Sequence, residues 1–253
     1  MDNHFKIIVP FYNVEQWIKL TTRSIRAQDY KNFECILIDD MSTDNSTDIA
    51  KEEIGDDNRF RIVVNKSKKY VLKNISDAIS LSKPNDEDII VILDGDDWFA
   101  KKDVLTLLHE TYNEEGCWLT YGSYMEYPSK VRGKFAKQVP KEIIDGNLFR
   151  TSPWMTSHLR TWKYGLWKHI DQQKTFVESS PLDDNNHFAF CWDLAYMFPL
   201  LELAGCRAHY ISDILYVYNR QNPLCCDKIK HQIQLEMEHK IRNMQRYAPL
   251  EKL

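Results

Sequence analysis

Two groups of aspartates directly follow apolar runs of this sequence. Asp94, Asp96 and Asp97 stand within four positions after the run Ile89–Leu93, and Gly95 between them permits a tight turn. Like charges grouped in this way repel: two charges ~4 Å apart cost about 4 kcal/mol at an effective dielectric of ~20. A fold keeps such a group where a cation compensates it, and carboxylate oxygens suit Mg²⁺ or Mn²⁺. The alternative, a solvated acidic turn, leaves the adjacency of an apolar run and three acids unexplained.

The second group is Asp39 and Asp40, which follow the apolar run Ile36–Ile38 and precede a polar turn. A carboxylate there accepts hydrogen bonds from a nucleobase N–H or from ribose hydroxyls. An ordinary turn is the alternative, since Asp, Ser and Thr favour turns. A nucleoside diphosphate is strongly negative, and the chain itself has a net charge of −4. A divalent ion that bridges Asp94 or Asp96 to the phosphates would neutralise this charge as a glycosidic bond breaks.

Alternating strands and helices must position these acids. The pattern predicts buried strands at residues 5–9, 33–38, 60–64 and 89–93, with helices near 14–25, 49–54, 71–79 and 104–112. Asn13, with Gln16 three residues later, predicts the start of the first helix. This order predicts an α/β fold with a mostly parallel central sheet flanked by helices. Ligands of such sheets bind beyond the carboxyl ends of the strands, where both aspartate groups stand.

The second half of the chain has a different pattern. Residues 121–127 predict a strand, and residues 210–218 predict short strands. Between them, residues 194–201 have helical spacing despite Pro199, and residues 228–246 predict a final amphipathic helix. The stretch 129–141 is loop-like and basic, with Lys130, Arg132, Lys134, Lys137 and Lys141. We therefore expect one main domain over residues 1–220 and a C-terminal helical extension over residues 221–253.

The composition of the sequence limits the binding partners and the cellular compartment that we expect for the protein. The net charge of −4 provides no basic field and argues against nucleic acid as a partner. No apolar run approaches the ~18–20 residues that span a bilayer, and the N-terminus lacks the features of a signal peptide. The six cysteines form no C-x-x-C pair, so we expect reduced thiols and no zinc site. A soluble, cytoplasmic protein is the expectation, and its oligomeric state stays open.

Three segments, in this order, resemble the family 2 glycosyltransferases, which have the GT-A fold. They are Ile7–Asn13, Glu34–Ser46 and Leu93–Asp97, the last of which is similar to the family's D-x-D metal motif. Together they cover about the first 100 residues. The resemblance implies a Rossmann-like GT-A domain with a nucleotide-sugar-binding half at residues 1–115 and an acceptor-binding half at residues 116–220. Met41 departs from the family, which usually has glycine there.

The resemblance also implies the donor site. Pro10 and Tyr12 would line the nucleobase pocket, Asp40 would bond the base with support from Asp39, and Glu15 would reach the nucleotide. The ribose, the diphosphate and a Mn²⁺ or Mg²⁺ ion would be held by Asp94 and Asp96, with Asp97 as a ligand or a support. Candidates to face the phosphates are Lys68, Lys69 and Lys73, although a solvated basic segment explains these lysines equally well.

The family's catalytic base is an acid farther along, and the similar segment here is Trp192-Asp193-Leu194. Asp193 is therefore the candidate base for a single displacement with inversion, and Asp183 and Asp184 are its rivals. His158 and Arg160 are candidate acceptor or phosphate contacts. Core packing or stacking on sugars would explain the tryptophans Trp154, Trp162 and Trp167.

The expected reaction is transfer of a sugar from a nucleoside-diphosphate sugar, with a UDP-sugar favoured, to an acceptor hydroxyl. The acceptor would be a glycan, a lipid-linked molecule or a protein. A single addition is expected, because the sequence lacks the Q-x-x-R-W motif and the membrane span of processive synthases. A nucleotidyltransferase and an inactive nucleotide-sugar-binding module are the alternatives. The turn Pro10–Asn13 lacks the glycine that a nucleotidyltransferase or a dinucleotide-binding enzyme requires there.

Overall fold

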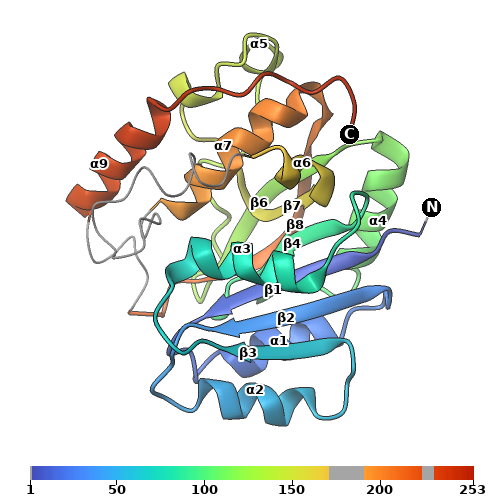
Figure 1. The fold of residues 1–253 in the computed structure, drawn as a ribbon, viewed down its shortest axis with the longest axis vertical. Coiled ribbons are helices and arrows are strands. Elements are labelled where there is room, and N and C mark those ends of the chain that lie inside the picture. The colour runs from blue at the N-terminus through green and yellow to red at the C-terminus, as the bar shows by residue number, and fades with distance from the viewer. Residues whose placement is uncertain (1, 171–190, 224–230) are drawn as a thin grey trace.

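The computed structural model describes residues 2–170, 191–223 and 231–253. Within these residues the strands form one eight-stranded sheet in the order β3-β2-β1-β4-β7-β6-β8-β5 (Figure 1). The strands are β1 (Phe5–Phe11), β2 (Phe33–Asp39), β3 (Phe60–Val64), β4 (Ile89–Ile92), β5 (Trp98–Phe99), β6 (Leu119–Tyr127), β7 (Ser157–Lys163) and β8 (Ala208–Asn219). The mostly parallel α/β sheet expected from the sequence is confirmed.

The first four strands form the parallel part of the sheet. β1 pairs with β2 on one side and with β4 on the other, and β3 extends the sheet beyond β2. Their carboxyl ends therefore meet at one edge, which brings the two aspartate groups to the same side of the molecule. Beyond β4 the direction reverses, because β7 runs antiparallel to β4, with Ile92 opposite Arg160.

Helices cover both faces of the sheet (Figure 1). One face packs against α1 (Ile18–Arg26), α2 (Ser46–Ile54) and α4 (Val104–Glu115), and the other against α3 (Tyr70–Ser82), α6 (Tyr164–Lys168), α7 (Trp192–Ala204) and α9 (His231–Arg242). The short helices α5 (Lys141–Asp145), η1 (Phe149–Thr151) and η3 (Gly205–Arg207) complete the described elements. Along β1, Ile7 and Val9 enter one core and Ile8 the other, as the alternation of a strand requires.

Several elements differ from the sequence-based prediction, among them α1, β7 and β8. α1 begins at Ile18, not beside Asn13: the latter has a φ of 51°, and its Oδ1 accepts a hydrogen bond from the Thr43 N–H at 2.8 Å. Strand β7 was not predicted, and the expected short strands at 210–218 are one strand, β8. The helix predicted near residue 194 is present as α7 and continues through Pro199.

The C-terminal chain fastens α7 from outside. After α9 it crosses α7 toward α6 (Figure 1), and the Leu250 N–H donates to the Leu203 carbonyl at 2.9 Å. Beneath it, the fully buried Glu202 of α7 receives Arg150 Nε at 2.6 Å and Nη2 at 2.9 Å, and the Tyr247 N–H at 3.0 Å. None of the helices in the described residues is long and apolar enough to span a bilayer.

Candidate active site

A cleft of about 700 Å³ opens at the carboxyl edge of the parallel strands and continues toward β7, β8, α7 and α9. Eight of the nine site residues predicted from the sequence line it: Pro10, Tyr12, Asp40, Asp94, Asp96, His158, Arg160 and Asp193. These residues come from positions up to 183 apart in the chain, from Pro10 to Asp193. The fold therefore gathers the predicted donor residues other than Glu15, together with the candidate base, into one cavity.

Glu15 is the predicted residue that does not line the cleft. Its carboxylate Oε2 accepts hydrogen bonds from the Asn45 backbone N–H at 3.0 Å and from the Asn45 amide at 2.9 Å. Its own N–H donates to the Asp44 carboxylate at 3.1 Å. The geometry thus assigns Glu15 to the turn that precedes α2.

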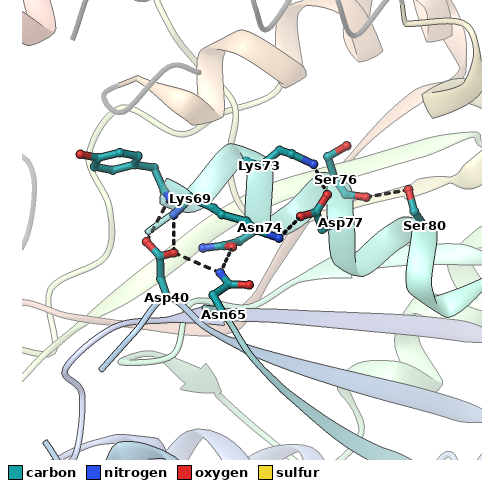
Figure 2. A network of polar contacts seen from close by, with 9 residues as sticks. Asp40, Asn65, Lys69, Lys73, Asn74, Ser76, Asp77 and Ser80 are labelled. Atoms are coloured by element: carbon teal, nitrogen blue, oxygen red, sulfur yellow. Dashed lines mark hydrogen bonds and ion pairs between the residues drawn. The ribbon is translucent and has the colours of Figure 1, made fainter. Parts of the chain in front are cut away.

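Asp40 is buried at the end of β2 and organises the loop that leads into α3 (Figure 2). Its carboxylate accepts the backbone N–H groups of Lys69 at 2.7 Å and Tyr70 at 3.0 Å, and the Asn65 amide at 3.1 Å. The same Asn65 amide donates to the Asn74 side-chain oxygen at 2.7 Å. Asp40 therefore faces the cleft while both of its oxygens hold the protein backbone, and any ligand N–H would use its remaining lone pairs.

The structure separates the three lysines considered for the phosphates. Lys69 and Lys73 form ion pairs with Asp77, the first at 2.8 Å (Figure 2). Partial burial raises the pKa of Asp77, but the bonds from both lysines outweigh it and hold that pKa below its ordinary value. Lys68 instead lines the cleft, with its ammonium 2.9 Å from the centre of the Tyr12 ring, a cation–π contact.

The aspartates after β4 have different surroundings. Asp97 is buried and accepts the Tyr216 hydroxyl at 2.5 Å and the Asn219 N–H at 2.7 Å, so it fastens β8 beneath the cleft. Asp96 accepts the Asn222 amide at 2.7 Å. In the turn between them and β4, a Cβ at Gly95 would collide with Phe11, so this close approach requires glycine.

The carboxyl group of Asp94 has a raised pKa, as expected where buried acids lie close together at a cation site. Burial and the neighbouring Asp96 charge raise the pKa of Asp94 to about 7, although Arg160 and the Tyr216 hydroxyl oppose the rise. No group of three or more His, Cys, Asp or Glu side chains is arranged as a metal site within the described residues. Two carboxylates nevertheless fit Mg²⁺ or Mn²⁺, which bind proteins through one or two carboxylates together with substrate phosphates.

Asp193 and Arg160 form an ion pair on the opposite wall. Asp193 stands in the first turn of α7, and its Oδ2 accepts Arg160 Nη2 at 2.9 Å. Arg160 is only 3% exposed, and its Nε has no hydrogen-bond partner among the described residues. The charges of Asp94 and Asp193 both act on Arg160. The guanidinium therefore interacts with both Asp94 and the candidate base. The two other candidates for the catalytic base, Asp183 and Asp184, lie outside the described residues.

Aromatic side chains form the rest of the wall. The His158 ring stacks on Tyr216, with ring centres 4.3 Å apart. Burial and the Arg160 charge hold the pKa of His158 well below its usual value, so the imidazole is neutral at physiological pH. Trp162 and Trp167 are core residues, whereas the half-buried Trp154 lines the cleft.

Sequence reasoning missed several residues that shape the site. Asn65 directly follows β3, so the rule that strand ends carry ligand-binding residues would have found it. Tyr216 and Asn222 meet the aspartates after β4 from β8 and the chain that follows it. Their approach depends on a pairing across more than 120 positions, which no local pattern reveals.

The sheet, its helices and the cleft at its carboxyl edge define a GT-A fold. The family described as "Glycosyl transferase family 2" matches residues 6–177. The chain belongs to this family and is a glycosyltransferase. Glycosyltransferase GlyG of Streptococcus pneumoniae serotype 4 is 31% identical over 225 residues, which cover 88% of this chain and 72% of GlyG.

Solved structures share the fold. The S. aureus TarS fragment 1–349 in complex with UDP-GlcNAc superposes with a TM-score of 0.63 at 21% identity, covering 87% of this chain and 59% of that one. The mannosyltransferase PcManGT of Pyrobaculum calidifontis, in complex with GDP-Man and Mn²⁺, gives a TM-score of 0.57 at 16% identity, covering 86% and 57%. This chain therefore spans less than two thirds of either structure.

Proposed function

We propose that the chain transfers a single sugar from a UDP-sugar to an acceptor hydroxyl, with a divalent ion and with inversion at the anomeric carbon. The observation that carries the proposal is the single cleft that is lined by Asp94, Asp96 and the ion pair of Arg160 with Asp193. The UDP-GlcNAc bound to TarS and the Mn²⁺ bound to PcManGT support the donor and the metal. In this arrangement residues 1–115 bind the donor, residues 116–220 bind the acceptor, and the helical extension over residues 221–253 adds α9 to the cleft wall.

The donor lies at the carboxyl edge of the parallel strands. Tyr12, 37% exposed, offers its ring to the nucleobase beside Pro10, and Asp40 offers its remaining lone pairs. Asp94 and Asp96 would hold Mg²⁺ or Mn²⁺ together with diphosphate oxygens. When bound, the ion offsets the negative charge of the leaving diphosphate.

Asp193 receives the acceptor proton. The acceptor oxygen attacks the anomeric carbon as the bond to the diphosphate oxygen breaks, and its proton passes to the Asp193 carboxylate. Arg160 fixes one oxygen of that carboxylate, and the Leu194 N–H lies 3.0 Å from the other, so the base has a defined orientation. Such general-base assistance is worth roughly 10²–10⁴-fold in rate.

The test is release of UDP from a panel of UDP-sugars with Mn²⁺, with acceptors of the three expected classes. Asp193→Asn should lower transfer by roughly 10²–10⁴-fold while the nucleotide still binds. Asp213→Asn is the matched control, because Asp213 is an exposed aspartate that pairs with Lys101. Transfer by Asp193→Asn at the control's rate would reject the base, and a product that retains the donor's anomeric configuration would reject inversion.

A further inference from the structure

An exposed segment, residues 127–137, projects from the end of β6 beside the cleft. It folds back on the strand: the Glu126 N–H donates to the Val131 carbonyl at 2.8 Å, and the Gly133 N–H to the Tyr124 carbonyl at 2.9 Å. A bridge between Met125 and Arg132 completes the hairpin. The segment is therefore a defined protrusion, and none of its residues has a role in the proposed chemical step.

Positive charge is concentrated on this segment, although the whole chain has a net charge of −4. Its basic side chains are all exposed: Lys130, Arg132, Lys134 and Lys137. Among the described neighbours, Glu126 at its base and Asp213 on β8 are acidic, and Asp213 already lies 3.5 Å from Lys101. The segment thus presents a net positive face to solvent.

Large apolar side chains alternate with these bases. Tyr127 is 39% exposed, Val131 44% and Phe135 42%. They keep this exposure although two of them have aromatic neighbours: the Tyr127 ring lies 5.2 Å from that of Trp98, and the Phe135 ring lies 6.2 Å from that of Tyr124. Bases interleaved with exposed apolar and aromatic side chains are the composition that binds the interface of an anionic bilayer, where the charges meet headgroups and the apolar groups enter the acyl boundary.

We propose that the segment 127–137 docks onto the surface of an anionic phospholipid bilayer. Each basic residue near such a surface strengthens binding roughly fivefold. A soluble polyanion would pair with the same bases, but it would leave Val131 and Phe135 in water. Phe135 also lines the rim of the cleft, so docking would place the cleft opening next to the bilayer. The proposal concerns binding alone and stands apart from the transfer reaction.

Co-sedimentation of the full chain with vesicles tests the proposal. Wild type should bind vesicles of phosphatidylglycerol and phosphatidylcholine in equal parts, and should release them as salt is added. It should not bind phosphatidylcholine alone. The variant Lys130→Gln/Lys134→Gln/Lys137→Gln loses three exposed charges and should bind roughly a hundredfold more weakly. Arg132 stays in place, because it holds the hairpin to the Ser212 carbonyl at 2.9 Å.

The matched control is Lys19→Gln/Lys51→Gln/Lys83→Gln, which removes the same charge from exposed lysines on other elements. Lys83 and Lys130 also have similar backbone conformations, with positive φ values of 46° and 59°, so the two substitutions are comparable in backbone strain. The control should bind as wild type does, and equal binding by the two triple variants would overturn the proposal.

A second pair of variants tests the contribution of the apolar side chains to vesicle binding. Phe135→Ser should weaken vesicle binding several-fold, since it removes an aromatic ring from the bilayer interface. Leu20→Ser is the control, because Leu20 is an exposed apolar residue on α1. Two results together would overturn the proposal and assign the surface to a soluble polyanion. Soluble polyphosphate at equal phosphate concentration would displace wild type from the vesicles, and Phe135→Ser would bind the vesicles as wild type does.

Discussion

Replacement of Glu202 by glutamine should destabilise the whole domain. Glu202 is fully buried and accepts two hydrogen bonds from Arg150 and one from the Tyr247 N–H. A glutamine NH₂ would face at least one of these donors, and the Arg150 charge, 2% exposed, would lose its counter-ion. Breaking a buried pair in this way costs about 3–5 kcal/mol. For a domain of this size the melting temperature should fall by roughly 6–20 °C.

Thermal unfolding by circular dichroism measures this loss. Glu87→Gln is the matched control: it breaks the Lys163 ion pair at 2.7 Å, but the Glu87 side chain is 65% exposed, so at most about 1 kcal/mol should be lost. Arg150→Met with Glu202→Leu removes both buried charges and should be milder than Glu202→Gln alone. A melting temperature for Glu202→Gln equal to that of the control would refute the reasoning that the pair clamps the C-terminal chain to α7.

Three further predictions concern the residues that follow β2 and the ion pairs of α3. Met41→Gly should stabilise the fold by about 0.5–1 kcal/mol in urea unfolding, because Met41 has a φ of 65° and is exposed; a lower urea midpoint would contradict it. Because its lysine partners outweigh burial and lower the pKa of Asp77, its ion pairs stabilise the fold at neutral pH, and this contribution is lost as pH falls through the lowered pKa. Stability curves of wild type and Lys69→Gln/Lys73→Gln should therefore converge in acid, and parallel curves would reject the assignment. Asp40→Ala should weaken UDP binding to folded protein roughly tenfold or more, and unchanged affinity in calorimetry would remove Asp40 from the nucleotide site.

The parallel half of the fold follows from sequence because its signals are local. Each of the four predicted strands is a short apolar run, and the aspartates that follow two of them do lie at one edge. The backbone at Met41 could also be anticipated: the family usually has glycine at this position, and Met41 has the positive φ that glycine favours. The conformation of these strands and turns therefore depends mainly on residues that are close in the sequence.

The other half depends on contacts between distant segments. β7 has mixed polarity, with His158 and Arg160 among its residues, and becomes a strand because it pairs with β4 about 70 positions earlier. Asn13 carries a capping signal, but its side chain bonds the Thr43 backbone across the sheet edge instead. The Arg160–Asp193 pair joins a strand to a helix and has no signature in either segment.

The most direct test of the account is calorimetric titration of UDP with and without Mn²⁺. Wild type should bind UDP much more tightly with Mn²⁺, because Asp94 and Asp96 share the ion with the diphosphate. Asp96→Asn should lose this enhancement, while Asp193→Asn and Asp213→Asn should keep it. Equal UDP affinity of wild type with and without Mn²⁺, or a full enhancement in Asp96→Asn, would contradict the account.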